Sequence, residues 1–209
     1  MSTALQRELT AGLAVMNLIA TEQQQTQYLA YLHLLAKWNR AYNLSAVRDI
    51  DQMLSRHLLD SLSIVPYFSA QNCLDVGSGG GLPGIPLAIT FPDRQFTLLD
   101  SNGKKTRFLF QAVNELGLKN VTVEQGRVEE KQAPPTYDGI VSRAFSTINA
   151  MLDSCAQILA ADGKVYAMKG QYPEEELKDL DSRFIVEVVH RLQVMPELGE
   201  RHLIILHKV

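Results

Sequence analysis

The residues best suited to bind a ligand are the glycines of segment 75–84, Asp-Val-Gly-Ser-Gly-Gly-Gly-Leu-Pro-Gly. Glycine has no Cβ, so a turn of this composition lets a ligand approach backbone N–H groups closely. Two cofactor patterns overlap here. Gly79, Gly81 and Gly84 satisfy the G-x-G-x-x-G fingerprint of dinucleotide-binding proteins, and the frame from Asp75 through Gly77 satisfies D-x-G-x-G-x-G.

The second frame favours S-adenosylmethionine over a dinucleotide. A dinucleotide fingerprint starts directly after its strand, whereas this one starts inside the expected strand. Pro83 and Pro86 also stand where a helix would donate N–H groups to a pyrophosphate. Asp75 can hold or organise an ammonium group, and Asp100, at the end of the next apolar run, can accept both hydrogens of a ribose diol. An NAD(P)-linked oxidoreductase is the alternative.

A parallel sheet must position these residues. Short apolar runs at 73–76, 96–99, 121–123, 139–142 and 165–168 alternate with helical patterns, three of which are expected at 83–91, around 108–116 and at 147–160. This alternation is typical of βαβ units. Runs at 185–192 and 202–207 predict an antiparallel pair at the end of the chain. The fold class expected is therefore α/β.

Residues 1–66 show helical patterns only. Thr21 is a suitable N-cap, and the aromatic and leucine side chains that follow recur at spacings of three and four, which predicts one buried helix face. Its members are Tyr28, Tyr31, Leu35, Trp38 and Tyr42. A second helical pattern, 53–65, should stop at Pro66. We expect a helical extension over 1–66 and one compact catalytic unit over 67–209.

Composition narrows the class of protein. The chain has 209 residues, 46% of them hydrophobic and 21% charged, which is ordinary for a soluble globular protein. No run of about 18 apolar residues predicts a membrane span. Cys73 and Cys155 match neither a disulfide framework nor a zinc spacing, so we expect no metal and a cytoplasmic location.

The formal net charge of −3 argues against indiscriminate nucleic-acid binding. Residues 144–209 carry seven Lys or Arg against ten Asp or Glu, so the whole excess lies in this part of the chain. The acids at 174–176, Asp179 and Asp181 account for it, and we expect them on the far side of the fold.

Several segments together resemble a known family. They are Asn-Leu-Ser-Ala-Val at 43–47, Arg-His-Leu-Leu-Asp-Ser at 56–61, the glycine segment at 75–86, 99–109, 127–129, 142–145, 169–171 and 199–203. Between residues 37 and 206 the chain resembles the RsmG (GidB) family, bacterial methyltransferases that act on N7 of a guanine (position 527, in the 530 loop) of 16S rRNA. The resemblance implies a Rossmann-like class I fold dependent on S-adenosylmethionine, with a mostly parallel seven-stranded sheet, an antiparallel C-terminal strand pair and an N-terminal helical extension. Gly80 departs from the proline or alanine frequent in relatives.

The resemblance also implies site residues. Together with the motif residues, the expected cofactor-binding set is Asp75, Gly77, Gly79, Gly81, Leu82, Asp100, Val128, Glu129 and Arg143. RNA binding needs cations for phosphate. The expected RNA-binding set is Arg56, His57, Lys104, Lys105, Arg107, Lys169 and Arg201, and the wider set of candidate cations adds Lys37, Arg40, Arg48 and Arg127.

The reaction requires no general base. Guanine N7 carries a free lone pair, so it can attack the sulfonium methyl in line. Asp60 and Arg143 are candidate charge stabilisers, because the base gains positive charge. Asp60 can instead cap its helix or pair with Arg56, Arg143 can form a structural ion pair, and His57 can be a packing residue.

The expected partner is 16S rRNA, within the 30S subunit or an assembly intermediate, and the expected state is a monomer. A third hypothesis is that the chain is a non-enzymatic RNA-binding or cell-division factor.

Overall fold

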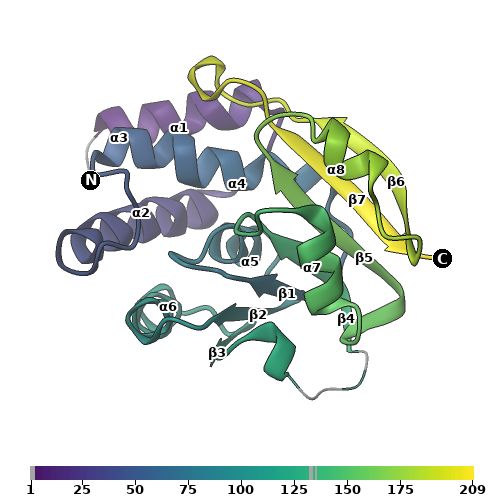
Figure 1. Ribbon diagram of the computed structural model, residues 1–209. Helices are drawn as coiled ribbons and strands as arrows, with labels where there is room; N and C mark the ends of the chain where they lie inside the picture. The colour runs from purple at the N-terminus through teal and green to yellow at the C-terminus, as the bar shows by residue number, and fades with distance from the viewer. Residues whose placement is uncertain (1–2, 132–133, 135) are drawn as a thin grey trace.

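The sheet is mixed and runs through the whole molecule. The computed structural model describes residues 3–131, 134 and 136–209. Within them the strands lie in the order β3-β2-β1-β4-β5-β7-β6, with β3 at one edge and the antiparallel pair β6 and β7 at the other (Figure 1). The bounds are β1 Asn72–Val76, β2 Gln95–Asp100, β3 Val121–Gln125, β4 Tyr137–Ser142, β5 Leu159–Lys169, β6 Phe184–Arg191 and β7 His202–Lys208. The predicted α/β class and the antiparallel C-terminal pair are confirmed.

The register brings the predicted ligand-binding turns together. β1 to β5 are parallel, and Val76 lies beside Leu99 while Asp75 lies beside Val141. The segments that leave β1, β2, β3 and β4 therefore emerge at the same edge of the sheet. The strand order reverses at β1 and β4, and open α/β sheets bind ligands at such a switch point.

Helices cover both faces of the sheet. Their bounds are α1 Thr3–Val15, α2 Glu22–Tyr42, α3 Ile50–Met53, α4 Asp60–Leu62, α5 Gly84–Thr90, α6 Gly103–Leu116, α7 Ile148–Cys155 and α8 Glu174–Lys178. Short 3-10 turns lie at Val65–Tyr67, Val128–Glu130 and Pro196–Leu198. Leu98 packs in one cluster with leucines of α1, α2 and α6, whereas Leu74 packs with α7 on the opposite face. The N-terminal helices thus share a core with the sheet. No helix in the described ranges is long and apolar enough to cross a membrane.

The long helix α2 matches its sequence prediction and also supports the glycine turn. Thr21 forms a capping box with Gln24, and Tyr28, Tyr31 and Leu35 are buried. The Tyr31 hydroxyl donates a 2.6 Å hydrogen bond to the carbonyl oxygen of Gly80. The face is therefore core over Tyr28, Tyr31 and Leu35, and it ties α2 to the turn after β1. The prediction is wrong for Tyr42, which is exposed near the end of the helix, and Trp38 is half-buried.

The second helical pattern departs from a regular α-helix. Residues 50–62 are continuously helical, but Leu54–Leu59 form a π-helical segment in which the Asp60 N–H reaches the carbonyl oxygen of Ser55, five residues earlier. Regular helix ends at Leu62, and Pro66 follows within a 3-10 turn. π-Helical segments often occur at functional sites. This one carries Arg56 and His57, and Asp60 follows it directly as the first residue of α4.

The helix predicted at 147–160 is shorter than expected. α7 ends at Cys155, and β5 begins at Leu159, well before the predicted 165. The carbonyl oxygen of Ile158 accepts backbone N–H groups of Thr136 and Tyr137 at 3.0 and 3.2 Å. Pairing with β4 therefore overrides the local helical preference of this alanine-containing stretch. Helix α8 was not predicted.

Candidate functional site

The first cavity, which we call the strand-end cavity, lies where β1 to β4 end and has a volume of about 280 Å³. Its lining residues are Val76, Gly77, Leu99, Asp100, Ser101, Lys105, Gly126, Arg127, Val128, Glu129, Ala144 and Phe145. Gly77 has a φ of +71°, and a Cβ there would lie 2.9 Å from the Ala144 Cβ. Only glycine leaves this approach open.

Asp100 organises the wall of the strand-end cavity. It is 7% exposed. Its Oδ2 accepts the N–H of Gly79 at 2.9 Å, its Oδ1 accepts the N–H of Asn102 at 2.8 Å, and the Lys105 ammonium lies 3.9 Å from Oδ2. Each carboxylate oxygen keeps a further lone pair for a ligand donor. Lys105, which the sequence analysis places in the RNA-binding set, lines the strand-end cavity.

The second cavity, the glycine-loop cavity, has a volume of about 180 Å³. The glycine turn, the segment after β4, α2, the segment after α2 and the π-helical segment all contribute to its lining. The residues are Gly77, Ser78, Gly79, Gly80, Leu82, Arg143, Ala144, Leu35, Leu44, Ser45 and His57. Of the predicted cofactor residues, Gly77, Gly79, Leu82 and Arg143 therefore meet here. Gly81 lines none of the cavities described; its position is set by packing, because a Cβ there would lie 2.4 Å from the Ile85 side chain.

Asp75 lies underneath the turn and lines neither of these two cavities. It is fully buried, and its Oδ2 accepts the Gly84 N–H at 2.9 Å. Its Oδ1 has no hydrogen-bond partner among the described residues. Burial raises the pKa of Asp75 to about 7, although the Gly84 N–H opposes the shift. The geometry favours an indirect role for Asp75, in which it holds the backbone of the turn in place, over direct contact with an ammonium group.

His57 is a neutral part of the glycine-loop cavity. Its Nε2 is hydrogen-bonded to the Ser45 hydroxyl at 2.6 Å, and its buried Nδ1 has no partner in the described chain. Burial, helped by the nearby Arg143 guanidinium, lowers the pKa of His57 to about 4. A lowered pKa favours the neutral imidazole, so an RNA contact by His57 would be a hydrogen bond and not an ion pair.

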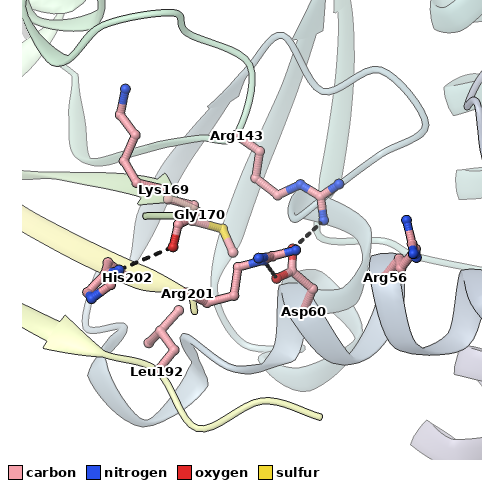
Figure 2. A pocket seen from close by; sticks show the side chains of 9 residues that line it. Arg56, Asp60, Arg143, Lys169, Gly170, Leu192, Arg201 and His202 are labelled. Carbon is pink, nitrogen blue, oxygen red and sulfur yellow. Dashed lines mark hydrogen bonds and ion pairs between the residues drawn. The ribbon is translucent and has the colours of Figure 1, made fainter. Parts of the chain in front are cut away.

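The third cavity, the arginine cavity, is about 280 Å³ in volume and is shown in Figure 2. Its lining residues are Arg56, Asp60, Arg143, Met168, Lys169, Gly170, Leu192, Arg201 and His202. Asp60 lies at its centre, where Oδ2 accepts from Arg143 Nη1 and Oδ1 accepts from Arg201 Nε, both at 2.9 Å (Figure 2). The alternative that Asp60 pairs with Arg56 is not found in the described chain: one buried carboxylate holds two other arginines.

The remaining predicted cations differ in their partners. Arg56 is exposed, points into the arginine cavity and forms no ion pair among the described residues. The Lys169 ammonium lies 2.9 Å from Glu176 of α8, which also accepts the N–H of Ile148. The acidic segment 174–181 is thus not confined to the far side of the fold. Lys104 and Arg107 are exposed on α6 and line none of the three cavities.

The three cavities form a row. Gly77 and Ala144 line both the strand-end and glycine-loop cavities, and Arg143 lines both the glycine-loop and arginine cavities. A ligand held at the strand ends can therefore present a reactive group in the middle cavity to a second ligand held by the arginines. This arrangement suits transfer of a small group between two bound molecules.

The sequence matches a known family over most of its length. The profile of rRNA small subunit methyltransferase G (GidB) matches residues 24–204. The chain belongs to this family. The ribosomal RNA small subunit methyltransferase G of Marinobacter nauticus is 56% identical over 95% of this chain and 92% of its own, and that of Cellvibrio japonicus is 52% identical over 98% and 96%.

Solved structures support the fold of this GidB family member. An Aquifex aeolicus SAM-dependent methyltransferase has a TM-score of 0.59 at 19% identity, covering 84% of this chain and 98% of its own. M. jannaschii TYW2, solved with AdoMet, has a TM-score of 0.53 at 16% identity, covering 73% and 76%. The Rossmann-like class I methyltransferase fold is confirmed, and the oxidoreductase alternative has no support from the family.

Several lining residues had no signal of their own in the sequence. Ala144, Phe145, Leu44, Ser45 and His202 lie in segments that carry the family resemblance, but none of them had a predicted role. Leu44 and Ser45 reach the glycine-loop cavity because the π-helical segment presents His57 to the segment after α2.

Proposed function

We propose that this chain transfers the methyl group of S-adenosylmethionine to N7 of one guanine in 16S rRNA. The observation that carries the proposal is the row of three cavities joined by Gly77, Arg143 and Ala144. In this scheme the strand-end cavity takes the nucleoside part of the cofactor, the glycine-loop cavity is the place of transfer and the arginine cavity takes the acceptor base.

The residues of the strand-end cavity fit the cofactor. Gly77 keeps the backbone open, Asp100 retains lone pairs for a ribose diol, and Val128 offers a buried apolar surface to an adenine ring. Glu129 is exposed beside Val128 and accepts a 2.9 Å hydrogen bond from Ser154, which leaves its second oxygen available. When bound, S-adenosylmethionine supplies an electrophilic methyl group on a positively charged sulfur.

The arginine cavity orients the acceptor. Guanidinium groups of Arg143 and Arg201 can donate to guanine O6 or to phosphate oxygens and leave the N7 lone pair free. No residue needs to remove a proton. His57, neutral and 8% exposed, contributes shape and a fixed contact to Ser45, not base catalysis.

Asp60 is a positioning residue in this scheme. The base becomes cationic as it accepts the methyl group, and two adjacent guanidinium groups would oppose that change. The Asp60 carboxylate, 2.9 Å from each, offsets part of their charge and holds both in place. This combines the two sequence-based candidates, Asp60 and Arg143, in one ion-pair network.

We propose that the enzyme works as a monomer, on a 30S particle or an assembly intermediate. Few large apolar side chains are exposed in the described chain, and apart from Val15 and Ile19 they are far apart in the sequence: Val15, Ile19, Tyr42, Phe110, Tyr172, Ile185 and Val209. Scattered residues of this kind do not form the contiguous patch that subunit association needs.

The direct test uses S-adenosylmethionine labelled on the methyl group, with naked 16S rRNA and with 30S subunits from a strain that lacks the modification. We expect label at one guanine, detected by reduction and aniline cleavage at N7-methylguanosine. Calorimetry with S-adenosylhomocysteine and with NADH runs beside it. Binding of NADH alone would overturn the proposal, and cofactor and RNA binding without label would favour the non-enzymatic reading.

A further inference from the structure

A group of basic side chains outside the three cavities lines a fourth cavity. His33, Lys37 and Arg40 of α2 are spaced by four and three residues, so they share one helix face. Arg48 joins them from the segment after the helix. Together with Ala36, Asp49 and Ile50 they line a cavity of about 490 Å³, which we call the α2 cavity.

The cations of the α2 cavity differ from most others near a cavity because acids do not neutralise them. Lys105, Arg143 and Lys169 each have a carboxylate within 4.0 Å. Lys37 and Arg40 are exposed and form no ion pair within the described part of the chain. In a chain of net charge −3, such a hollow concentrates positive potential.

The polar contacts of the α2 cavity leave these two charges available. Arg48 is already engaged: its Nη1 donates to the carbonyl oxygen of Asn39 at 2.7 Å, and its Nη2 donates to the Asn43 side chain. Asp49, the carboxylate in the lining, accepts the Asp51 N–H at 3.0 Å. Arg48 therefore holds a fixed charge at the rim, while Lys37 and Arg40 are free to meet an anion.

The segment after α2 contributes side chains to both the α2 cavity and the glycine-loop cavity. Buried Asn39 fixes this segment, because its side chain accepts the Ser45 N–H at 2.8 Å and donates to the Val47 carbonyl oxygen at 2.7 Å. Ser45 faces the glycine-loop cavity, and Arg48 faces the α2 cavity. An extended ligand bound in the glycine-loop cavity can therefore continue past this segment into the α2 cavity.

We propose that the α2 cavity binds a backbone phosphate of the substrate RNA, on a nucleotide flanking the guanine held by the arginine cavity. The proposal rests on the proposed function for the identity of the RNA. Two free cations in a hollow suit a compact anion. A membrane surface would instead require exposed apolar side chains beside the cations, and the apolar members of this lining, Ala36 and Ile50, are half-buried.

The test compares two double variants with the same charge change. Lys37→Gln/Arg40→Gln removes the free cations and keeps good helix formers on α2. Lys119→Gln/Lys164→Gln removes one cation just before β3 and one in the middle of β5, where Lys164 pairs with Glu187, and serves as control. The measurement is the affinity for 16S rRNA as a function of salt, by filter binding, with S-adenosylhomocysteine affinity and unfolding as checks on the fold.

We expect the salt slope of log affinity to fall by about 0.7 for each phosphate that the α2 variant no longer binds, and the KM for RNA to rise about tenfold with kcat within about twofold. The control should keep the wild-type slope. Equal slopes for the α2 variant and wild type, or equal reductions in both variants, would overturn the proposal. So would wild-type binding to phosphatidylglycerol vesicles that the α2 variant loses while its RNA slope is unchanged.

The salt dependence of RNA affinity can be measured without any methyl transfer. Absence of methyl transfer by the wild-type chain would therefore count against the proposed function alone, and the slopes would still decide whether the α2 cavity binds phosphate.

Discussion

The strand-end cavity and the arginine cavity lie along one row but are built in different ways. Backbone conformation shapes the first: Gly77 stays open at positive φ, and Asp100 holds the N–H of Gly79. Side-chain charges shape the second, where Asp60 binds Arg143 and Arg201 from elements far apart in the chain. A cavity shaped by backbone is sensitive to added atoms, and one shaped by ion pairs is sensitive to the removal of charge.

The largest effect should come from adding one methyl group to the strand-end cavity. Gly77→Ala places a Cβ 2.9 Å from Ala144 at a φ of +71°, and we expect S-adenosylhomocysteine affinity to fall about 10³-fold in calorimetry. Gly117→Ala is the matched control, since Gly117 has a φ of +64° and open space around its Cβ position. Similar affinity losses in both variants would show that backbone strain, and not the approach to Ala144, is responsible.

Removing the central charge of the arginine cavity should have the next largest effect. We expect Asp60→Asn to lower kcat about 10²-fold while S-adenosylhomocysteine affinity stays within about twofold, because two guanidinium groups then face the base without their counter-charge. Asp60→Glu, which keeps the charge, should recover part of the rate. Glu187→Gln, at a surface ion pair with Lys164, is the control and should behave as wild type.

Two buried carboxylates extend the comparison, because no described cation forms an ion pair with Asp75 whereas Asp60 is paired with two arginines. With a pKa of about 7, folded Asp75 keeps a proton that the unfolded chain releases near pH 4. Its contribution to stability is therefore lost as the pH rises through this range. Asp75→Asn does not titrate, so its free energy of unfolding relative to wild type should rise on the order of 2 kcal/mol from pH 5 to pH 8.

Urea unfolding of both proteins at the two pH values measures this difference. Asp153→Asn, at an exposed ion pair, corrects for the general change in charge. A stability difference between Asp75→Asn and wild type that is the same at pH 5 and pH 8 would mean that Asp75 is ionised throughout.

The smallest expected effect distinguishes two cations within the arginine cavity. Arg56 has no carboxylate partner in the described chain, whereas Lys169 is paired with Glu176. Arg56→Gln should lower the salt slope of RNA binding by about 0.7, and Lys169→Gln should leave it nearly unchanged. Filter binding across a salt series measures both slopes. A larger change for Lys169→Gln would show that RNA displaces Glu176.

Much of the fold followed from local patterns. The N-cap at Thr21, the strands from β1 to β4 and the antiparallel end pair were predicted because each depends on residues close in sequence. The helix at 147–160 was predicted too long, because the pairing of β5 with β4 near Leu159 is a contact between strands that periodicity does not report. The π-helical turn of Leu54–Leu59 likewise has no local signature.

Some parts of the candidate site could likewise be predicted from the sequence, and others could not. Sequence patterns were enough to predict the family, the glycine turn and the acid of the next strand. The turn and the acid follow adjacent parallel strands whose ends must meet. The folded structure was needed to show that Asp60 joins Arg143 and Arg201, 83 and 141 positions away, and that burial lowers the pKa of His57. Charge pairing and burial depend on which side chains the folded chain brings within a few ångströms, and spacing along the sequence does not contain that distance.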